Sequence, residues 1–295
     1  VCSLGHSHPH VISAISKQLE TLSHVSNLYY IEPQIGVAKL LVENSFADRV
    51  FFCNSGAEAN EAAIKLARKY AHENLGKNKY ELITMLNSFH GRTLATVAAT
   101  GQEKFHKGFE PLPLGFRYVP FNDLSSLKEA IDDKTCGVML EPIQGEGGVV
   151  IPDEGYLKAV RQICDQNKIL LLLDEVQVGM GRTGSLFAYE ESGIKPDILT
   201  LAKALGNGFP VGAMLATEQV AKAFVPGSHA STFGGNPLAM AAACATLETL
   251  LGDRVLENCR AMGLYFREKL EEIKQRHRSV QAVRGKGLIL AMELD

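Results

Sequence analysis

Short hydrophobic runs alternate with longer amphipathic stretches along most of the chain. The hydrophobic runs predict strands at 49–53, 79–86, 135–140, 168–173, 197–201 and 288–295, with a further short strand that ends at Tyr118 and Val119. Hydrophobic residues at helical spacing predict helices at 9–19, 33–45, 55–68, 123–133, 153–167, 238–251 and 253–277, and directly after Thr93. This alternation favours an α/β fold with a doubly wound, mainly parallel sheet.

The run at Ile169–Leu173 contains only Leu and Ile and leads directly into Asp174 and Glu175. A strand without polar positions is typical of the centre of a parallel sheet, where helices cover both faces. Its two acids then lie at the carboxyl end of the strand, which is the edge where open α/β sheets bind their ligands. A carboxylate beside a dry core costs free energy unless a positive group meets it. We therefore expect Asp174 to face a cation.

A second polar segment, Asn54–Asn60, joins the strand at 49–53 to an Ala-rich helix. Small residues at a helix start, here Ser55 and Gly56, leave backbone N–H groups free, and the helix dipole makes that position attractive to a phosphate. Asn and Ser are equally suited to an ordinary N-cap. For this segment taken alone, a phosphate site and a plain N-cap both remain open.

The loop after the strand at 79–86 combines an aromatic residue, a glycine and an arginine in Phe89–Thr93. Phe89 is suited to stack on a planar ring, and Arg92 is suited to bind a carboxylate through two hydrogen bonds. The alternative places Phe89 in the core and Arg92 on the surface, and the loop alone favours that alternative. Acids and glycines also follow the strand at 135–140, in Glu141–Gly148.

Lys203 follows the predicted strand at 197–201. Its neighbours are small or apolar: Ala202, Ala204, Leu205 and Gly206. A lysine in an apolar pocket is available as an amine nucleophile, the property needed for a Schiff base. The alternative is a lysine whose side chain extends to solvent. A polar loop, Ser228–Pro237, comes later in the chain.

Two motifs match known binding patterns but lack the structural context of those patterns. Gly179–Gly184 has the G-x-G-x-x-G spacing of dinucleotide-binding proteins. There the glycines join a strand directly to a helix, whereas here Asp174–Gln177 intervene and no helical pattern follows, so we expect a mobile glycine loop. His6, His8 and His10 alternate near the start of the chain, but no acidic cluster lies nearby, so a loop leading into a helix is favoured over a metal site.

The chain has 295 residues, 46% hydrophobic and 21% charged, enough for one large α/β domain and part of a second. We expect an N-terminal segment at 1–27, a large domain at 28–236, and a linking helix with the start of a smaller C-terminal α/β domain at 237–295. The net charge of −3 argues against nucleic-acid binding, and no hydrophobic run reaches the length that crosses a membrane. The six scattered cysteines predict reduced thiols and a cytoplasmic location. Because the chain starts without Met and ends within a predicted strand, we expect a fragment that lacks both termini.

Together these segments meet the requirements of one ligand. They supply a phosphate site at Ser55, an aromatic side chain for a flat ring at Phe89, a buried carboxylate at Asp174, an amine at Lys203 and a carboxylate-binding Arg92. Pyridoxal 5′-phosphate (PLP) fits them, because a Schiff-base lysine and an Asp on the pyridinium nitrogen are its marks. The cation that meets Asp174 is then the protonated ring nitrogen, which makes the ring an electron sink.

The same segments resemble the class III (subgroup II) aminotransferases of fold type I, most closely the acetylornithine aminotransferases. The resemblance covers essentially the whole chain. It rests on the motifs Asn54–Asn60, Phe89–Thr93, Glu141–Glu146, Leu173–Gln177, Leu201–Gly206 and Ser231–Pro237. His90 stands where ornithine δ-aminotransferases tend to carry Trp, which favours the acetylornithine branch.

The resemblance implies roles for the residues that match the cofactor site. Lys203 and Asp174 are expected to be catalytic: Lys203 binds the cofactor covalently and moves a proton, and Asp174 holds the ring nitrogen. Gln177 is expected near the 3-oxygen of the ring, with Phe89 and Val176 on its two faces. The remaining expected cofactor contacts are phosphate ligands: Ser55, Gly56 and Ala57, and Thr232 for the other subunit.

The resemblance also implies the substrate contacts. Arg92 is expected to bind the distal carboxylate, and Ser231 to lie beside the phosphate. Glu146 resembles the residue that pairs with a second, C-terminal arginine, expected beyond Asp295. Glu175 is left as a structural partner to nearby donors. Family members are dimers with shared active sites, so a homodimer is expected.

The implied reaction is transamination of N2-acetyl-L-ornithine with 2-oxoglutarate, which gives N-acetyl-L-glutamate 5-semialdehyde and L-glutamate in arginine biosynthesis. Succinyl-diaminopimelate is a possible further substrate. The alternatives are another class III aminotransferase, acting on succinylornithine, ornithine or 4-aminobutyrate, and an aminomutase of the same fold. A nicotinamide-dependent oxidoreductase built on Gly179–Gly184 is the alternative from another class of enzyme.

Overall fold

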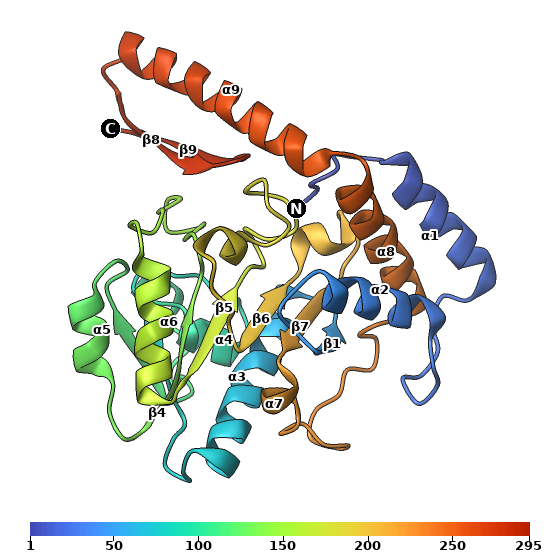
Figure 1. The fold of residues 1–295 in the computed structure, drawn as a ribbon, viewed down its shortest axis with the longest axis horizontal. Coiled ribbons are helices and arrows are strands. Elements are labelled where there is room, and N and C mark those ends of the chain that lie inside the picture. Colours follow the sequence, from blue (N-terminus) through green and yellow to red (C-terminus); the bar gives the residue numbers. More distant parts are fainter.

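A seven-stranded sheet forms the centre of the computed structural model, which describes residues 1–295 (Figure 1). Its strands, in spatial order, are β1 (Arg49–Cys53), β7 (Gly212–Ala216), β6 (Ile198–Leu201), β5 (Leu170–Asp174), β4 (Thr135–Leu140), β2 (Glu81–Met85) and β3 (Phe116–Val119). β7 is antiparallel to both of its neighbours, and the other strands share one direction. The predicted α/β fold with a mainly parallel sheet is confirmed, and β5 is its middle strand.

Helices cover both faces of this sheet (Figure 1). One face packs against α3 (Gly56–Asn74), α4 (Leu94–Ala99) and α7 (Glu218–Ala221). The other packs against α2 (Glu32–Glu43), α5 (Leu124–Ala130), α6 (Tyr156–Asn167) and α8 (Pro237–Gly252). Leu170 and Leu172 belong to the core on the α3 face, and Leu171 and Leu173 to the core on the α6 face. Burial of both faces explains why this strand has no polar position before its end.

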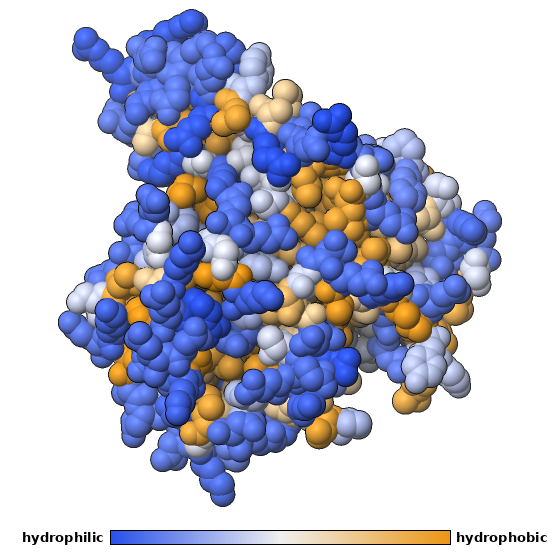
Figure 2. Space-filling model, viewed as in Figure 1, coloured by the Kyte–Doolittle hydropathy of each residue, from blue (hydrophilic) through white to orange (hydrophobic).

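The remaining elements lie at the two ends of the chain. Helix α1 (Pro9–Thr21) packs against α8 through Val11. Helix α9 (Val255–Arg276) and the hairpin β8 (Val280–Lys286)–β9 (Ile289–Leu294) form a unit outside the main sheet. The visible face of this C-terminal unit is largely hydrophilic, and hydrophobic atoms gather below it, near the centre of the view (Figure 2). The predicted domain boundaries after residues 27 and 236 stay predictions.

Two strands were not predicted from the sequence, β7 and β8. β7 follows a turn rich in Gly and Pro, and its direction brings its first residue, Gly212, to the same edge as the last residues of the parallel strands. β8 carries polar residues and pairs with β9, the strand that was predicted at the end of the chain. No helix has both the length and the apolar character that crossing a bilayer requires.

The glycine loop Gly179–Gly184 is held at several points rather than free, in contrast to the expected mobile loop. The Leu288 amide donates to the Arg182 carbonyl over 3.0 Å, and Arg182 Nη2 donates to the Leu288 carbonyl over 2.6 Å. The loop leads into a 3₁₀ helix at Ala188–Ser192 instead of an α-helix. It therefore lacks the strand–turn–helix context of a dinucleotide site and joins the large sheet to the C-terminal unit.

Candidate active site

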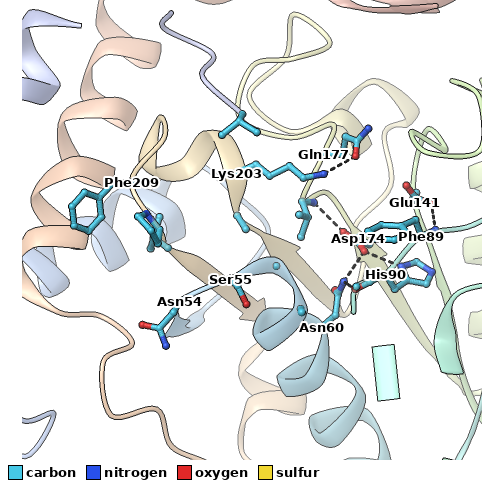
Figure 3. A pocket seen from close by; sticks show the side chains of 18 of the residues that line it. Asn54, Ser55, Asn60, Phe89, His90, Glu141, Asp174, Gln177, Lys203 and Phe209 are labelled. Carbon is cyan, nitrogen blue, oxygen red and sulfur yellow. Dashed lines mark hydrogen bonds and ion pairs between the residues drawn. The ribbon is translucent and has the colours of Figure 1, made fainter. Parts of the chain in front are cut away.

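A cavity of about 290 Å³ lies at the carboxyl edge of the sheet (Figure 3). Six strand ends contribute to it, because the chain leaves β1, β2, β4, β5 and β6 at this edge and enters β7 there. Its main polar and aromatic lining residues are Ser55, Asn60, Phe89, His90, Glu141, Asp174, Gln177 and Lys203. Segments separated by more than a hundred residues thus meet around one hollow, as expected for the ligand site of an open α/β sheet.

The start of α3 forms one wall of the cavity. Ser55 is the N-cap, and its Oγ accepts a hydrogen bond from the Glu58 amide over 3.1 Å. Gly56 and Ala57, the first residues of the helix, also line the cavity, and N–H groups at this position have no acceptor within the helix. A Cβ on Gly56 would lie 2.6 Å from Val176 Cγ1. The N-cap and an anion cradle therefore coexist, and the cradle fits a phosphate.

Asp174 ends β5 and is only 3% exposed. Its Oδ2 accepts hydrogen bonds from Asn60 Nδ2 over 2.7 Å and from His90 Nδ1 over 2.8 Å. Its Oδ1 accepts from the Val176 amide over 3.0 Å. Three donors from three elements therefore fix this carboxylate at the cavity wall, the place predicted for the partner of a ring nitrogen.

Glu175 points to the opposite side of the strand. Its two carboxylate oxygens accept hydrogen bonds from the Ala188 and Tyr189 amides, each over 2.7 Å. Burial raises the pKa of Glu175 to about 8, and the two amide donors work against that shift. The expectation of a structural partner to nearby donors is confirmed, and those donors are backbone amides of the 3₁₀ helix after the glycine loop.

Lys203 enters the cavity from the turn after β6. Its Nζ donates a hydrogen bond to Gln177 Oε1 over 2.6 Å (Figure 3). Its backbone has a φ of 43°, a left-handed conformation that is uncommon for a residue other than glycine. The amine is therefore held inside the cavity rather than extended to solvent, and the strained turn aims it there.

Three buried residues at the site were not predicted as site residues from the sequence: Asn60, His90 and Glu141. Asn60 is 1% exposed and lies on the buried face of the Ala-rich α3, where a polar side chain is a signal that it has a specific partner. Glu141 accepts hydrogen bonds from the Phe89 amide over 3.0 Å and the Gly145 amide over 3.2 Å. Burial raises the pKa of Glu141 to about 7, with His90 opposing the shift. Glu141 thus holds the loop that carries Phe89.

The structure places four predicted residues outside the cavity lining: Arg92, Glu146, Ser231 and Thr232. The exposed Arg92 guanidinium lies 4.3 Å from the Phe105 ring centroid and 5.3 Å from that of Phe89. Glu146 and Thr232 are exposed, and Ser231 Oγ accepts from Asn54 Nδ2 over 3.2 Å. The other predicted cofactor residues do line the cavity: Ser55, Gly56, Ala57, Phe89, Asp174, Val176, Gln177 and Lys203. The functional roles of the predicted residues, both those that line the cavity and those outside it, stay predictions.

Comparisons with known proteins agree with this geometry. The model of the family "Aminotransferase class-III" matches residues 1–295. The chain is 58% identical to the acetylornithine aminotransferase of Caldanaerobacter subterraneus and 56% identical to that of Methanocaldococcus jannaschii, covering all of this chain and 75% and 74% of the relatives.

Solved structures give the same result. The ornithine aminotransferase of Toxoplasma gondii superposes with a TM-score of 0.96 at 36% identity, and the N-acetylornithine aminotransferase of Stenotrophomonas maltophilia with 0.86 at 43%. All of this chain is covered, and 71% and 73% of the two structures. Another structure of the Toxoplasma enzyme has PLP at partial occupancy in its active site. The chain belongs to the class III aminotransferases, which are PLP-dependent enzymes.

Proposed function

We propose that this chain carries out the transamination of N2-acetyl-L-ornithine with 2-oxoglutarate, giving N-acetyl-L-glutamate 5-semialdehyde and L-glutamate. The observation that carries the proposal is the meeting of Lys203, Asp174 and the start of α3 around one cavity. The acetylornithine substrate is supported by relatives of that name at 51–58% identity over all or nearly all of the chain. This activity would place the enzyme in arginine biosynthesis.

The residues divide the work of cofactor binding. When bound, PLP supplies an electron sink that stabilises negative charge on the substrate carbon. The N–H groups of Gly56 and Ala57 bind its phosphate, supported by the dipole of α3. Asp174 keeps the ring nitrogen protonated, because a buried carboxylate favours a cation beside it. Phe89 and Val176 pack on the two ring faces.

Lys203 carries the proton transfer in this proposal. Its Nζ would accept and hold the proton of the substrate carbon that bears the amino group. Gln177 holds that amine through the 2.6 Å hydrogen bond and would also contact the 3-oxygen of the bound ring. Without the turn after β6, the amine would not reach the same cavity as Asp174, so the turn is the positioning element.

Substrate binding falls to residues at the rim. Arg92 binds the distal carboxylate of either substrate, because a guanidinium matches a carboxylate in two parallel hydrogen bonds. Its guanidinium lies over the rings of Phe89 and Phe105, and it forms no ion pair with an acidic side chain. Ser231 lies beside the phosphate wall, and Glu146 is free to pair with an arginine.

A second copy of the chain completes the site in this proposal. Exposed apolar side chains cluster beside the loop that carries Thr232: Leu28 is 90% exposed, Tyr30 97% and Phe233 59%. Asn27 joins the two segments by donating to the carbonyls of Ser231 and Gly234 over 3.0 and 2.9 Å. Apolar side chains exposed to this extent side by side are typical of a protein interface. The dimer brings Thr232 to the phosphate of the partner subunit.

The cellular location is proposed from the cysteines. All six are free, and four are buried. Unpaired buried thiols are typical of a reducing compartment, so we place the enzyme in the cytoplasm.

A second candidate is ornithine transamination, favoured by the TM-score of 0.96 to an ornithine aminotransferase. A substrate panel decides between the two: acetylornithine, succinylornithine, ornithine, 4-aminobutyrate and succinyl-diaminopimelate, each with 2-oxoglutarate. We expect the highest kcat/KM with acetylornithine. A higher value with free ornithine would overturn the assignment. Turnover without any oxo acid would indicate an aminomutase instead.

The control for this assay is Lys203→Ala. The purified protein should show a visible absorption band of bound PLP that borohydride removes, and the variant should lack both this response and the activity. A colourless wild-type protein, together with full activity in Lys203→Ala, would contradict the proposal and favour an enzyme of another class.

A further inference from the structure

We propose that Asn60 is a positioning residue that fixes Asp174 relative to the phosphate cradle. Asn60 lies on α3, one turn after Gly56, so one rigid helix carries both the cradle and the amide that holds the carboxylate (Figure 3). The inference rests on the proposed cofactor placement, with the phosphate at the start of α3 and the ring nitrogen at Asp174. Asn60 is not itself one of the proposed cofactor ligands.

The hydrogen bonds of Asn60 fix the orientation of its side-chain amide. Its Nδ2 donates to Asp174 Oδ2 and to the His90 carbonyl, both over 2.7 Å. Its Oδ1 accepts from Thr200 Oγ1 over 2.7 Å. Since the Asp174 carboxylate and the His90 carbonyl only accept hydrogen bonds, the amide nitrogen must face them, and the amide oxygen then faces Thr200 on β6 and accepts from its hydroxyl.

Only an amide meets these partners. A carboxylate at position 60 would put a second negative charge against Asp174, and an aliphatic side chain would leave the Thr200 hydroxyl and one bond of Asp174 unmade. All three side chains are at most 3% exposed, so water does not replace a lost bond easily. The chain therefore has a specific chemical reason for an Asn in the middle of an Ala-rich helix.

The geometric consequence is a fixed distance between two contacts of one ligand. Gly56 and Asn60 are four residues apart, roughly 6 Å along the helix axis. A ligand that contacts the helix start with one end and Asp174 with the other must have a length that matches this spacing. Losing the Asn60 bond would let Asp174 shift relative to the cradle, so both ends could no longer be bound well at once.

The test compares two ligands with the apo-protein, pyridoxamine 5′-phosphate and pyridoxamine, by fluorescence titration. In the wild type, the dissociation constant of pyridoxamine divided by that of pyridoxamine 5′-phosphate measures how much the phosphate adds to the affinity when the ring is in place. Asn60→Ala should weaken binding of the phosphorylated form by about ten- to a hundredfold, the range for a hydrogen bond to a charged group, and should lower this ratio. Thr200→Val, which only releases the amide oxygen, should do the same to a smaller extent.

Asn74→Ala is the matched control, because Asn74 lies on the same helix and donates only to the Tyr70 carbonyl at its far end. It should change binding by less than about twofold. In an Asp174→Asn background the amide loses its charged partner, so Asn60→Ala should cost much less there than in the wild type. Circular dichroism and thermal unfolding of each apo-variant report whether it is folded. If Asn60→Ala is not folded, Thr200→Val is used for the test instead.

The inference would be overturned if Asn60→Ala and Asn74→Ala changed the dissociation constant of pyridoxamine 5′-phosphate equally. It would also be overturned if Asn60→Ala changed this constant equally in the wild type and in the Asp174→Asn background. These outcomes leave the proposed function intact as long as the wild type binds pyridoxamine 5′-phosphate. A wild type that binds neither ligand would overturn the proposed function, and the inference with it.

Discussion

The Nδ1 atom of His90 lies 2.8 Å from Oδ2 of Asp174, and both side chains are buried. This contact joins the loop after β2 to the end of β5, two strands that are separated in the sheet by β4. The same oxygen also receives the Asn60 amide. Asp174 is therefore held from both a loop and a helix, which is why its substitution is the most direct test of the site.

We expect Asp174→Asn to bind PLP but to lose about a hundredfold or more in kcat, the scale seen when one preorganised electrostatic group is removed. The amide keeps the shape but cannot hold the ring nitrogen protonated. Cofactor content from the visible spectrum and kcat from a coupled glutamate assay check this. A near-normal kcat would rule out the role.

Arg92→Ala should raise KM for acetylornithine and for 2-oxoglutarate by about tenfold or more, because each would lose a charge-assisted hydrogen-bond pair. Lys104→Ala is the matched control, since Lys104 also lies over the Phe105 ring, at 4.9 Å, but is given no substrate contact. Steady-state kinetics of both variants decide the matter. Unchanged KM values in Arg92→Ala would remove this residue from the site.

Gly56→Ala should weaken PLP binding, because the new Cβ would lie 2.6 Å from Val176 Cγ1 and push that side chain toward the ring position. Gly252→Ala serves as the control, since a Cβ there meets no atom within 4 Å. Equilibrium dialysis of PLP against the two apo-variants measures the effect. Equal affinities would show that Val176 moves away without cost.

The stability of the protein should fall as the pH rises from about 5 to 8, through burial of Glu175 and Glu141. Burial raises the pKa of Glu175 from 4.5 to about 8 and that of Glu141 from 4.5 to about 7. The unfolded chain releases these protons first, so it binds fewer protons than the folded chain within this window, and the free energy of unfolding decreases with pH.

Glu175→Gln removes one of these two titrations and, at low pH, also loses an acceptor for a backbone amide. The stability gap between wild type and variant should therefore narrow as the pH rises. Urea unfolding at a series of pH values measures it, with the exposed Glu129→Gln as the control that keeps the wild-type slope. A gap that does not change with pH would contradict the assignment.

Tyr30→Glu should shift the protein from dimer to monomer and weaken PLP binding, since Tyr30 is 97% exposed in the single chain and the change places a charge in the proposed interface. Tyr265→Glu, at a residue 57% exposed on α9, is the control. Sedimentation velocity reports the oligomeric state. If the Tyr30 variant sediments as the wild type does, the proposed interface is wrong.

The fold was predictable where the pattern of hydrophobic residues is strong and local. β5 and α3 follow directly from their composition, and the order of strands and helices gave the α/β class. β7 was missed because Gly212, Ala213 and Ala216 are small and follow a turn rich in glycine, which is typical of a loop. Its strand character comes from pairing with β1, whose Cys53 lies opposite Gly212 despite the long separation in sequence.

The site was predictable to the extent that its residues lie at strand ends. Asp174, Lys203 and Phe89 were found in this way. Asn60, His90 and Glu141 were missed because their partners are distant along the chain: Asn60 and Asp174 are 114 residues apart, and His90 and Asp174 are 84 apart. A polar residue on the buried face of a helix signals that a partner exists, but only the packing of α3 on β5 identifies it.

The alternation of β5 also makes strand length a determinant of the chemistry. Asp174 and Glu175 are neighbours of nearly the same composition, yet Asp174, the last residue of β5, lies at the cavity wall, and Glu175, the next residue, accepts hydrogen bonds from the Ala188 and Tyr189 amides. Insertion of one leucine into β5 would leave an equally hydrophobic strand, yet it would put a leucine in the place of Asp174 and move Asp174 into the place of Glu175. The acid that faces the cavity in this protein is thus set by the number of residues in the strand.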